Sequence, residues 1–430
     1  MNIAVLSYEY PPETGFGGIG TYSYYHARAL AKLGHQVHVF AGSTRVGVFH
    51  SEHDGVRVTR VRTDGWVQRV LKPARDREWF WFHNRVETAY AQYIAMRQAL
   101  RHETFDIVEA PECGADAAAV STLLRVPVAV RFHSPARLIM GTYKTPKLDR
   151  ELTAAVERIA INRARVRTAC SRFVAEQVAD TMAVPRPIHV IPNGIDLELF
   201  DREDASGVPP AVELPADAVT IFFANRLEER KGIHLIADIA VRVMKRYSHV
   251  HFVLAGRDLF GYVAQNVVPR IREQGLGDRF HVPGALDLAA VRAMLKRSDI
   301  FLLPSLWENC PYSCIEAMAA GRAIVSSDCG GMPELIADRS NGLLAANGDA
   351  SSFAERLEEL IEDQPLRERL GTAARRTVEQ RLTDVDVARR ICDVYSETLY
   401  GGSPAAADES SSKADGDIST TAAARSRSTA

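Results

Sequence analysis

Asp299-Ile-Phe-Leu-Leu303, Pro304-Ser-Leu-Trp-Glu-Asn-Cys-Pro-Tyr-Ser-Cys-Ile-Glu-Ala-Met-Ala-Ala-Gly321 and Ala323-Ile-Val-Ser-Ser327 form the stretch that decides the fold. Its two apolar ends predict buried strands, and its centre predicts a loop followed by a helix. Pro311 separates that loop, with Glu308, from the helix, with Glu316. Ligands of open α/β sheets bind at the carboxyl ends of strands, so both carboxylates are candidates to face one ligand. The alternative is a pair of solvated glutamates.

Similar strand and helix patterns alternate along the rest of the chain, which favours parallel sheets covered by helices. Strands are expected at 3–7, 36–41, 56–61, 106–109, 128–132, 189–191, 219–224, 250–255, 279–282, 299–303, 323–327 and 342–344. Helices are expected at about 21–33, 79–101, 114–124, 149–167, 172–181, 232–247, 262–274, 287–297, 312–320, 350–362 and 366–400. The pattern predicts an α/β protein with two doubly wound, Rossmann-like domains that face a cleft.

The domain boundaries follow from composition. Residues 1–196 and 219–380 each carry a full set of strands, and the polar, turn-rich segment 197–218 is expected to link them. A last helix is expected at 381–401. The tail 402–430 is rich in Ser, Ala, Thr, Asp and Gly, and it is expected to be disordered because it can bury little apolar surface.

Composition excludes several classes of protein. The chain has 430 residues, 46% of them hydrophobic, and a net charge of −2, which gives no reason to expect nucleic acid as a partner. No apolar run reaches the roughly 18 residues of a membrane span. The N-terminus is predicted to be a strand and not a signal peptide. Six scattered cysteines favour free thiols in the cytoplasm over disulfides or zinc.

Two loops are candidates to bind an anion. Gly17 and Gly18 precede the first long helix, where bare backbone N–H groups and the helix dipole favour negative charge. The loop formally fits a dinucleotide-binding motif, but the second strand ends without the acidic residue that would bind a ribose. Arg226 and Lys231 flank the start of another helix and suit a diphosphate. A solvated basic turn is an equal alternative for that pair.

Three further features could be structural or functional. His133 ends a buried strand and would point into the cleft between the domains. The turn at Asn193-Gly194 favours a structural role. Glu334 follows Gly330-Gly331 and could bind a ligand or only cap a helix.

Taken together and in this order, these motifs resemble the retaining glycosyltransferases of family 4, also called glycosyl transferases group 1. The motifs are the Gly17-Gly18-Ile-Gly20 loop, Pro192-Asn-Gly-Ile-Asp196, Arg226 with Lys231-Gly232, Glu308 with Glu316, and Gly330-Gly-x-Pro-Glu334. The resemblance covers roughly residues 1–400. It implies the GT-B architecture, in which the last helix crosses back to the first domain.

The resemblance also implies roles for these residues. Arg226 and Lys231 would bind the diphosphate of a nucleotide-diphospho-sugar donor, UDP- or GDP-linked. Glu316 would bind the ribose, and Glu308 the donor sugar. The segment around Leu286 would touch the base, and His133 would lie near the donor sugar and the acceptor.

The expected reaction is hexosyl transfer with retention of configuration, without a metal or another cofactor, because the cations can stabilise the departing diphosphate. Asp384-Val-Asp386 and Asp415-Gly-Asp417 do not resemble metal-diphosphate sites. The acceptor would be a glycan, a lipid-linked sugar or a small molecule, which suggests polysaccharide biosynthesis. The alternatives are a nucleotide-sugar 2-epimerase and a catalytically silent nucleotide-sugar-binding subunit.

Some residues depart from the family pattern. Cys310-Pro311-Tyr312 replaces an aromatic-glycine pair, which predicts altered contacts to the donor sugar. Glu109 and Glu112 could bind acceptor hydroxyls or an amino sugar, or could be solvated loop charges.

Residues 57–85 carry eight Lys or Arg among several aromatic residues. This segment could contact the inner face of a membrane, or form an ordinary core edged by solvated arginines.

Overall fold

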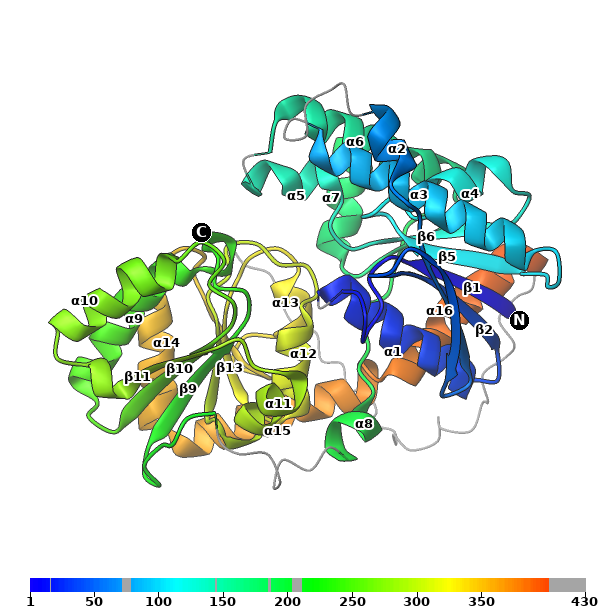
Figure 1. Cartoon of the computed structure of the whole chain (residues 1–430). Coiled ribbons are helices and arrows are strands. Elements are labelled where there is room, and N and C mark those ends of the chain that lie inside the picture. The colour runs from blue at the N-terminus through cyan, green and yellow to red at the C-terminus, as the bar shows by residue number, and fades with distance from the viewer. Residues whose placement is uncertain (16, 72–78, 144, 185–186, 203–210, 402–430) are drawn as a thin grey trace, which may run out of the picture.

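The computed structural model describes residues 1–15, 17–71, 79–143, 145–184, 187–202 and 211–401. It shows two α/β halves, each built on one sheet (Figure 1). The first sheet has the strand order β3-β4-β2-β1-β5-β6-β7-β8, and the second has the order β11-β10-β9-β12-β13-β14. Neighbouring strands run parallel, except that β3 is antiparallel to β4. The expected α/β architecture, with two mostly parallel sheets, is confirmed.

The first sheet and its helices occupy the first half of the chain. Its strands are β1 Asn2–Ser7, β2 Gln36–Gly42, β3 Gly47–His53, β4 Val56–Arg62, β5 Ile107–Pro111, β6 Val128–Phe132, β7 Val166–Ala169 and β8 His189–Val190. Its helices are α1 Gly18–Lys32, α2 Trp66–Leu71, α3 Phe80–Ala99, α4 Ala118–Leu123, α5 Ala136–Ile139, α6 Lys147–Arg163 and α7 Arg172–Met182, and α8 Leu197–Arg202 leads out of this half. A 3-10 turn spans Met140–Tyr143.

The second sheet and its helices follow. Its strands are β9 Val219–Ala224, β10 Val250–Ala255, β11 Phe280–Gly284, β12 Ile300–Leu303, β13 Ala323–Ser327 and β14 Leu343–Ala345. Its helices are α9 Ile233–Arg246, α10 Val268–Glu273, α11 Leu288–Arg297, α12 Tyr312–Ala319, α13 Met332–Leu335, α14 Ala350–Glu362, α15 Gln364–Arg381 and α16 Asp384–Tyr400. Short 3-10 turns lie at Glu229–Lys231 and Gly277–Arg279, and a π-helical segment lies at Val263–Val267. The central strand β12 is buried along its whole length, as its apolar sequence requires.

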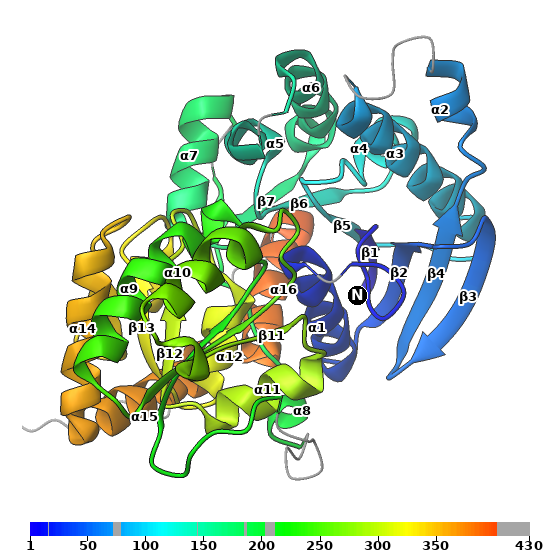
Figure 2. The same cartoon turned by 60° about the vertical axis from the view of Figure 1, so that its left-hand side comes forward.

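The short helices α2, α5 and α8 were not expected, and the structure differs from the sequence predictions in three further elements. β3 was not expected, and it forms an exposed antiparallel edge at the outer side of the first sheet (Figure 2). β7 was not expected, because the predicted helix 149–167 ends earlier, at Arg163. The predicted helix 366–400 is two helices, because the chain breaks at Leu382 and Thr383 caps α16 by accepting a hydrogen bond from the Asp386 N–H. Residues 203–210 of the expected linker and the tail 402–430 lie outside the described residues.

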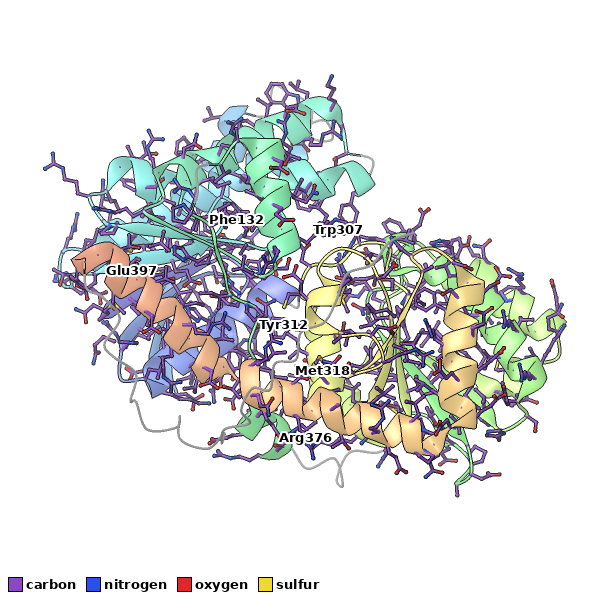
Figure 3. All side chains as sticks on the ribbon, turned by 180° about the vertical axis from the view of Figure 1, so that it is seen from behind. Phe132, Trp307, Tyr312, Met318, Arg376 and Glu397 are labelled. Atoms are coloured by element: carbon purple, nitrogen blue, oxygen red, sulfur yellow. The ribbon has the colours of Figure 1, made fainter. Side chains whose placement is uncertain are left out.

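The chain crosses between the two halves twice, side by side. Ile195 donates to the carbonyl of Leu382 and accepts from the N–H of Asp384, with both N···O distances 2.9 Å. Beyond this pairing, α15 and α16 run along the back of both halves, and α16 packs against α1 (Figure 3). Tyr395 of α16 donates to the buried carboxylate of Glu109 on β5. The last helix therefore crosses back to the first domain, as the family resemblance implies.

Candidate active site

The loop after β9 and the loop after β12 bring Lys231 and Glu308 together. Gly232, at φ +76°, ends the short turn that carries Lys231, and a side-chain Cβ there would lie 1.8 Å from the carbonyl oxygen of Pro304. Glycine is therefore required for the two loops to approach this closely. The N–H of Leu306 donates to the carbonyl of Arg230 at 2.9 Å, which fixes the loops to one another.

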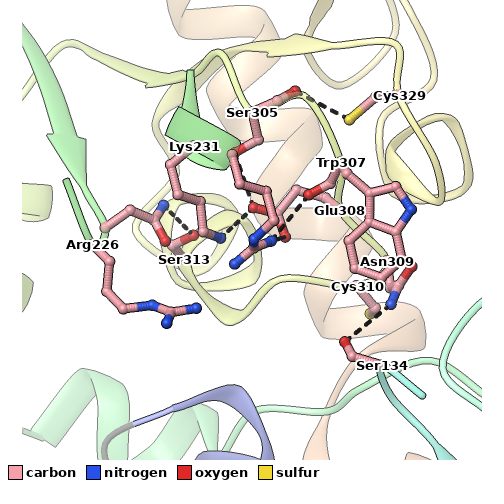
Figure 4. A network of polar contacts seen from close by, with 12 residues as sticks. Ser134, Arg226, Lys231, Ser305, Trp307, Glu308, Asn309, Cys310, Ser313 and Cys329 are labelled. Atoms are coloured by element: carbon pink, nitrogen blue, oxygen red, sulfur yellow. Dashed lines mark hydrogen bonds and ion pairs between the residues drawn. The ribbon is translucent and has the colours of Figure 1, made fainter. Parts of the chain in front are cut away.

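Glu308 is the centre of this cluster (Figure 4). Its Oε1 accepts from Lys231 Nζ in a very short ion pair and from Ser305 Oγ at 2.9 Å. Among the described residues, its Oε2 has only a longer contact, 3.9 Å from Arg230 Nη1. Burial would raise the pKa of Glu308, but the Lys231 and Arg230 charges outweigh that effect and hold the pKa below its usual value. Glu308 is therefore an ionised acceptor, with one oxygen less engaged than the other.

Lys231 is as deeply buried as its partner, with 6% of its surface exposed against 5% for Glu308. Burial lowers the pKa of Lys231, while the Glu308 charge opposes that shift. A buried lysine and a buried glutamate are stable together because each compensates the desolvation of the other. The structure therefore brings together two residues that the family resemblance assigns to the donor, and their roles stay a prediction.

Arg226 is not part of that buried pair. Its guanidinium points away from Lys231 (Figure 4), and its Nη2 lies 3.3 Å from Glu228 Oε1 and 3.5 Å from the hydroxyl of Tyr143 in the first domain. The side chain remains half exposed. Arg226 is thus a cation at the opening of the cluster, held by weaker contacts than those of Lys231.

Arg230 is a member of the cluster that sequence reasoning missed. Its Nη1 donates to the carbonyl of Trp307 at 3.2 Å, and its Nη2 donates to Glu228 Oε1 at 3.0 Å. Its position beside Lys231 in a basic run was the available signal. The sequence analysis selected only Arg226 and Lys231 from this basic run. The structure places three cations, these two and Arg230, around Glu308 and Glu228.

Glu316 lies on α12, the helix that follows the Glu308 loop. Within the described residues its carboxylate makes no hydrogen bond, although Arg292 and Tyr25 lie close enough to interact with its charge. Burial raises the pKa of Glu316 to about 7, and the Arg292 charge only partly opposes this. The group therefore titrates near neutral pH.

His133 lies at the end of β6 and is buried. Its backbone N–H donates to both oxygens of Glu112 at 2.9 Å, and its carbonyl accepts from the side chain of Asn309 in the second domain. Burial, and then the Arg131 charge, lowers the pKa of His133 to about 3, so the imidazole is neutral. Its Nε2 has no hydrogen-bond partner among the described residues.

The glycine loop before α1 differs from the bare loop that the sequence predicts. A Cβ at Gly17 would lie 3.1 Å from Glu9 Oε2, whereas a Cβ at Gly18 would have no neighbour within 4 Å. Burial raises the pKa of Glu9, while the N–H of Gly20 and the charges of nearby arginines oppose the shift. A carboxylate of the chain itself thus lies at the start of α1, and sequence reasoning missed it because Glu9 precedes the loop.

Leu286 lies in the loop between β11 and α11, where it is half-buried against the core. Nothing in its surroundings distinguishes a base contact from a packing residue. Its role therefore stays a prediction.

The Cys310-Pro311-Tyr312 segment faces the first domain. Asn193 Nδ2 donates to the carbonyl of Cys310 at 2.8 Å, and the hydroxyl of Tyr312 donates to the carbonyl of Gly194 at 3.1 Å. Arg131 Nη2 donates to Asn193 Oδ1 at 3.1 Å. The Asn193-Gly194 turn therefore has the structural role that its sequence favours. It contacts the Cys310-Pro311-Tyr312 segment, where the sequence departs from the family pattern.

Two glutamates join or stabilise the halves. Glu334 accepts from the N–H groups of Arg172 and Phe173 at 2.7 and 2.9 Å, so it caps α7 of the other domain and not its own helix. Glu109 accepts from the hydroxyl of Tyr22 at 2.7 Å and lies 2.9 Å from His26 Nε2.

Neither Glu109 nor Glu112 is free for an acceptor, and neither is solvated, because both are buried and hydrogen-bonded. Both readings of these two residues from the sequence were wrong. Among the described residues, no group of three or more His, Cys, Asp or Glu is arranged to hold a metal ion. No helix of the described chain is both long and apolar enough to cross a bilayer.

Comparison with known families identifies this arrangement. Residues 16–199 match the family Glycosyltransferase Family 4, and residues 209–377 match Glycosyl transferases group 1. The chain belongs to the group 1 glycosyltransferases. As a group 1 glycosyltransferase of the GT-B type, it is an enzyme that uses nucleotide sugars.

Curated relatives align with this glycosyltransferase over almost their whole length. Glycogen synthase of Mycobacterium tuberculosis is 26% identical over 419 residues, which is 93% of this chain and 96% of the relative. The MMP alpha-(1->4)-mannosyltransferase of Mycolicibacterium hassiacum is 24% identical over 433 residues, covering 93% and 98%. The D-inositol 3-phosphate glycosyltransferase of Paenarthrobacter aurescens is 26% identical over 379 residues, covering 85% and 90%.

Solved structures of group 1 and related enzymes share the fold. Sucrose-phosphate synthase from Thermosynechococcus elongatus superposes with a TM-score of 0.73 at 19% identity, covering 94% of this chain and 100% of that one. The catalytic domain of starch synthase IV from Arabidopsis thaliana, bound to ADP and acarbose, gives 0.73 at 15% identity, covering 93% and 99%. HepE from Anabaena, in complex with UDP and glucose, gives 0.66 at 20% identity, covering 92% and 100%.

Proposed function

We propose that this glycosyltransferase transfers a hexosyl group from a UDP- or GDP-linked sugar to a glycan, a lipid-linked sugar or a small acceptor. The observation that carries the proposal is the buried ion pair of Lys231 and Glu308, with Arg230 and Arg226 beside it. Three cations in a partly water-excluded site suit a departing nucleoside diphosphate, on which negative charge develops. Glu308 Oε2, the less engaged oxygen, is placed to accept from a hydroxyl of the donor sugar.

Glu316 and His133 complete the proposed donor site. The Glu316 carboxylate has no hydrogen-bond partner among the described residues, so two ribose hydroxyls could donate to it. The neutral imidazole of His133 has a free Nε2 and sits where the first domain meets the Asn309 loop. A neutral histidine can accept or donate one hydrogen bond to a sugar without adding charge.

The proposed reaction retains configuration at the sugar and needs no divalent metal. Support for retention is that Glu308 is tied to Lys231 and Ser305, which suits a group that holds the donor better than a free nucleophile. Support for metal independence is that cations already surround the expected diphosphate position. Proton NMR of the first product formed tests the configuration, and assays with EDTA test the metal requirement.

For the acceptor, the names of the relatives span a glucan, a mannoside and an inositol phosphate, so we propose a carbohydrate or polyol acceptor and a role in polysaccharide or glycoconjugate synthesis. We also propose that the enzyme works in the cytoplasm and touches the membrane through an apolar surface made by Trp66, Val70, Phe80 and Trp81. All four side chains are exposed, Val70 by 64% and Phe80 by 56%.

For the membrane contact predicted at residues 57–85, an electrostatic contribution has less support than an apolar one. Each arginine that the structure describes in this segment is engaged within the protein. Arg57 pairs with Glu103, Arg69 with Asp64 and Arg85 with Glu157, while Arg60 and Arg62 donate to backbone carbonyls. Residues 72–78 lie outside the described residues. The proposed membrane contact therefore depends mainly on apolar side chains.

A screen of nucleotide sugars tests the proposed function. Calorimetric titration with UDP-, GDP- and ADP-sugars should identify one donor that binds the folded enzyme. Adding carbohydrate acceptors should then release nucleoside diphosphate in step with product. Conversion of the donor alone would indicate an epimerase, and binding without any turnover would indicate a silent subunit.

A further inference from the structure

A cavity lies beside the two chain crossings. Its volume is about 370 Å³, within the range of small-molecule sites, about 300–1,000 Å³. The first domain contributes Ser171 and Arg172 to its walls, the second contributes Asn309 and Arg381, and α16 contributes Arg390. We call it the crossover cavity. Lys231, Glu308 and Glu316 do not line it, whereas Cys310, whose segment was predicted to contact the donor sugar, does.

The crossover cavity is basic, and its three arginines, Arg172, Arg381 and Arg390, are exposed to solvent. Neither Arg172 nor Arg381 has a side-chain hydrogen bond or ion pair within the described part of the chain. Arg390 has only a 3.5 Å contact from Nη2 to the carbonyl of Val190. Three cations around one cavity repel each other, so an anion among them is stabilised.

The single carboxylate in the wall does not neutralise the arginines. Glu334 lines the cavity, but both its oxygens accept from backbone N–H groups at the start of α7, at 2.7 and 2.9 Å. The cavity wall therefore holds three guanidinium groups against one committed carboxylate. Guanidinium groups bind phosphate oxygens in pairs, which favours a phosphate over a carboxylate ligand.

Asn309 adds a requirement for a hydrogen-bond donor on the ligand. Its Nδ2 donates to the carbonyl of His133, but its Oδ1 is buried and has no partner in the described structure. A buried acceptor without a donor costs free energy, and a ligand hydroxyl in the cavity would satisfy it.

We propose that the crossover cavity binds a small phosphate monoester that carries hydroxyl groups, such as a sugar phosphate. The phosphate contacts Arg172 and Arg381, one from each domain, with Arg390 nearby, and a hydroxyl donates to Asn309 Oδ1. Because its walls come from both domains, the ligand bridges them. It also touches the loop that carries Glu308, which places it where it can influence the donor site.

Calorimetry with inorganic phosphate and with glucose 6-phosphate tests this proposal. Both should bind the wild-type enzyme, and glucose 6-phosphate should bind about fivefold more tightly because of the added hydrogen bond. The double variant Arg172→Ala/Arg381→Ala should bind each anion at least about 100-fold more weakly. Arg376→Ala is the matched control, because Arg376 is an exposed arginine of α15 (Figure 3), the helix that also carries Arg381. Arg376 does not line the cavity, and the variant should bind like the wild type.

A further variant separates this cavity from the donor site. Arg226→Ala removes an exposed cation of the donor site and should leave the binding of both anions unchanged. Absence of binding to the wild type, equal binding to the Arg172→Ala/Arg381→Ala variant, or loss of binding in Arg226→Ala would each overturn the proposal. Equal affinity for the two anions would overturn the assigned hydroxyl contact to Asn309.

Discussion

Lys231 and Glu308, 77 residues apart in the sequence, form an ion pair at the carboxyl end of the second sheet. Both are buried, and both come from loops that follow neighbouring strands, β9 and β12. Removal of either partner strongly destabilises the folded protein, because the other charge remains buried and unpaired. Its two residues are therefore coupled in folding and, under the proposed function, in donor binding.

Glu308→Gln should lower kcat/KM for sugar transfer by about 100-fold. A neutral amide keeps the shape of the side chain, but it neither balances Lys231 and Arg230 nor accepts as strongly from a sugar hydroxyl. Initial rates of nucleotide release measure the effect, and circular dichroism checks the fold. Glu273→Gln, an exposed glutamate on α10, is the control. A Glu308→Gln enzyme with wild-type kinetics would refute the role of Glu308.

Glu316 makes stability depend on pH. Its pKa in the folded protein is about 7, against a usual value of 4.5. Between these values the unfolded chain is ionised while the folded one keeps its proton, so stability falls as pH rises through that window, by roughly 3 kcal/mol. Glu316→Gln has no such group. Urea unfolding should show the variant gaining stability on the wild type between pH 5 and pH 8, and a constant difference would contradict this.

The same titration should affect donor binding. The ionised carboxylate accepts two ribose hydroxyls, whereas the protonated one does so less well. Nucleoside diphosphate affinity should therefore rise from pH 6 to pH 8 in the wild type by more than it does in Glu316→Gln. Calorimetry on both proteins at each pH gives this difference, and parallel curves would speak against ribose binding by Glu316.

Glu334 should stabilise the contact between the domains. Glu334→Ala removes the acceptor of two exposed N–H groups at the start of α7, at a cost of about 1 kcal/mol because water partly replaces it. Urea denaturation measures the loss. Glu176→Gln, an exposed residue on α7, is the control and should change stability little. An equally small effect for Glu334→Ala would show that the cap contributes nothing.

The apolar surface of Trp66, Val70, Phe80 and Trp81 predicts binding to lipid vesicles. Flotation should recover the wild type with both neutral and anionic vesicles, because burial of apolar side chains dominates. Phe80→Ser/Trp81→Ser should abolish flotation. Phe260→Ser, which changes a 72% exposed aromatic on the second domain, should not. Failure of the wild type to float would end the membrane proposal.

How much of the fold the sequence predicts depends on how apolar each strand is. β12 and β13 were found because their apolar runs are bounded by turn residues. β3, Gly47-Val-Phe-His-Ser-Glu-His53, was missed because it is an exposed edge with little hydrophobic pattern. β7 was missed because Val166-Arg-Thr-Ala169 is short and follows a helix directly. The break between α15 and α16 was missed because it depends on Thr383. A single threonine within a helical pattern does not identify the start of a new helix.

In the candidate site too, some features could be predicted from the sequence and others could not. The family resemblance implied that Lys231 and Glu308 face one donor, but their direct ion pair was not predicted. The contacts of Glu334 with α7 and of Asn193 with Cys310 were not, because they depend on how the two domains pack. Glu9 and Arg230 lie beside the recognised motifs and not at the positions that define them. The sequence patterns therefore did not identify them as candidate site residues.

The most direct test of the proposed donor site is nucleoside diphosphate binding to Lys231→Ala. Calorimetric titration of the wild type with UDP and GDP should show binding of one of them, and Lys231→Ala should bind it at least about 100-fold more weakly. Lys245→Ala, a lysine on α9 that donates to Gln274 at 2.6 Å, is the control with the same loss of charge. Wild-type affinity in a folded Lys231→Ala protein would contradict the account.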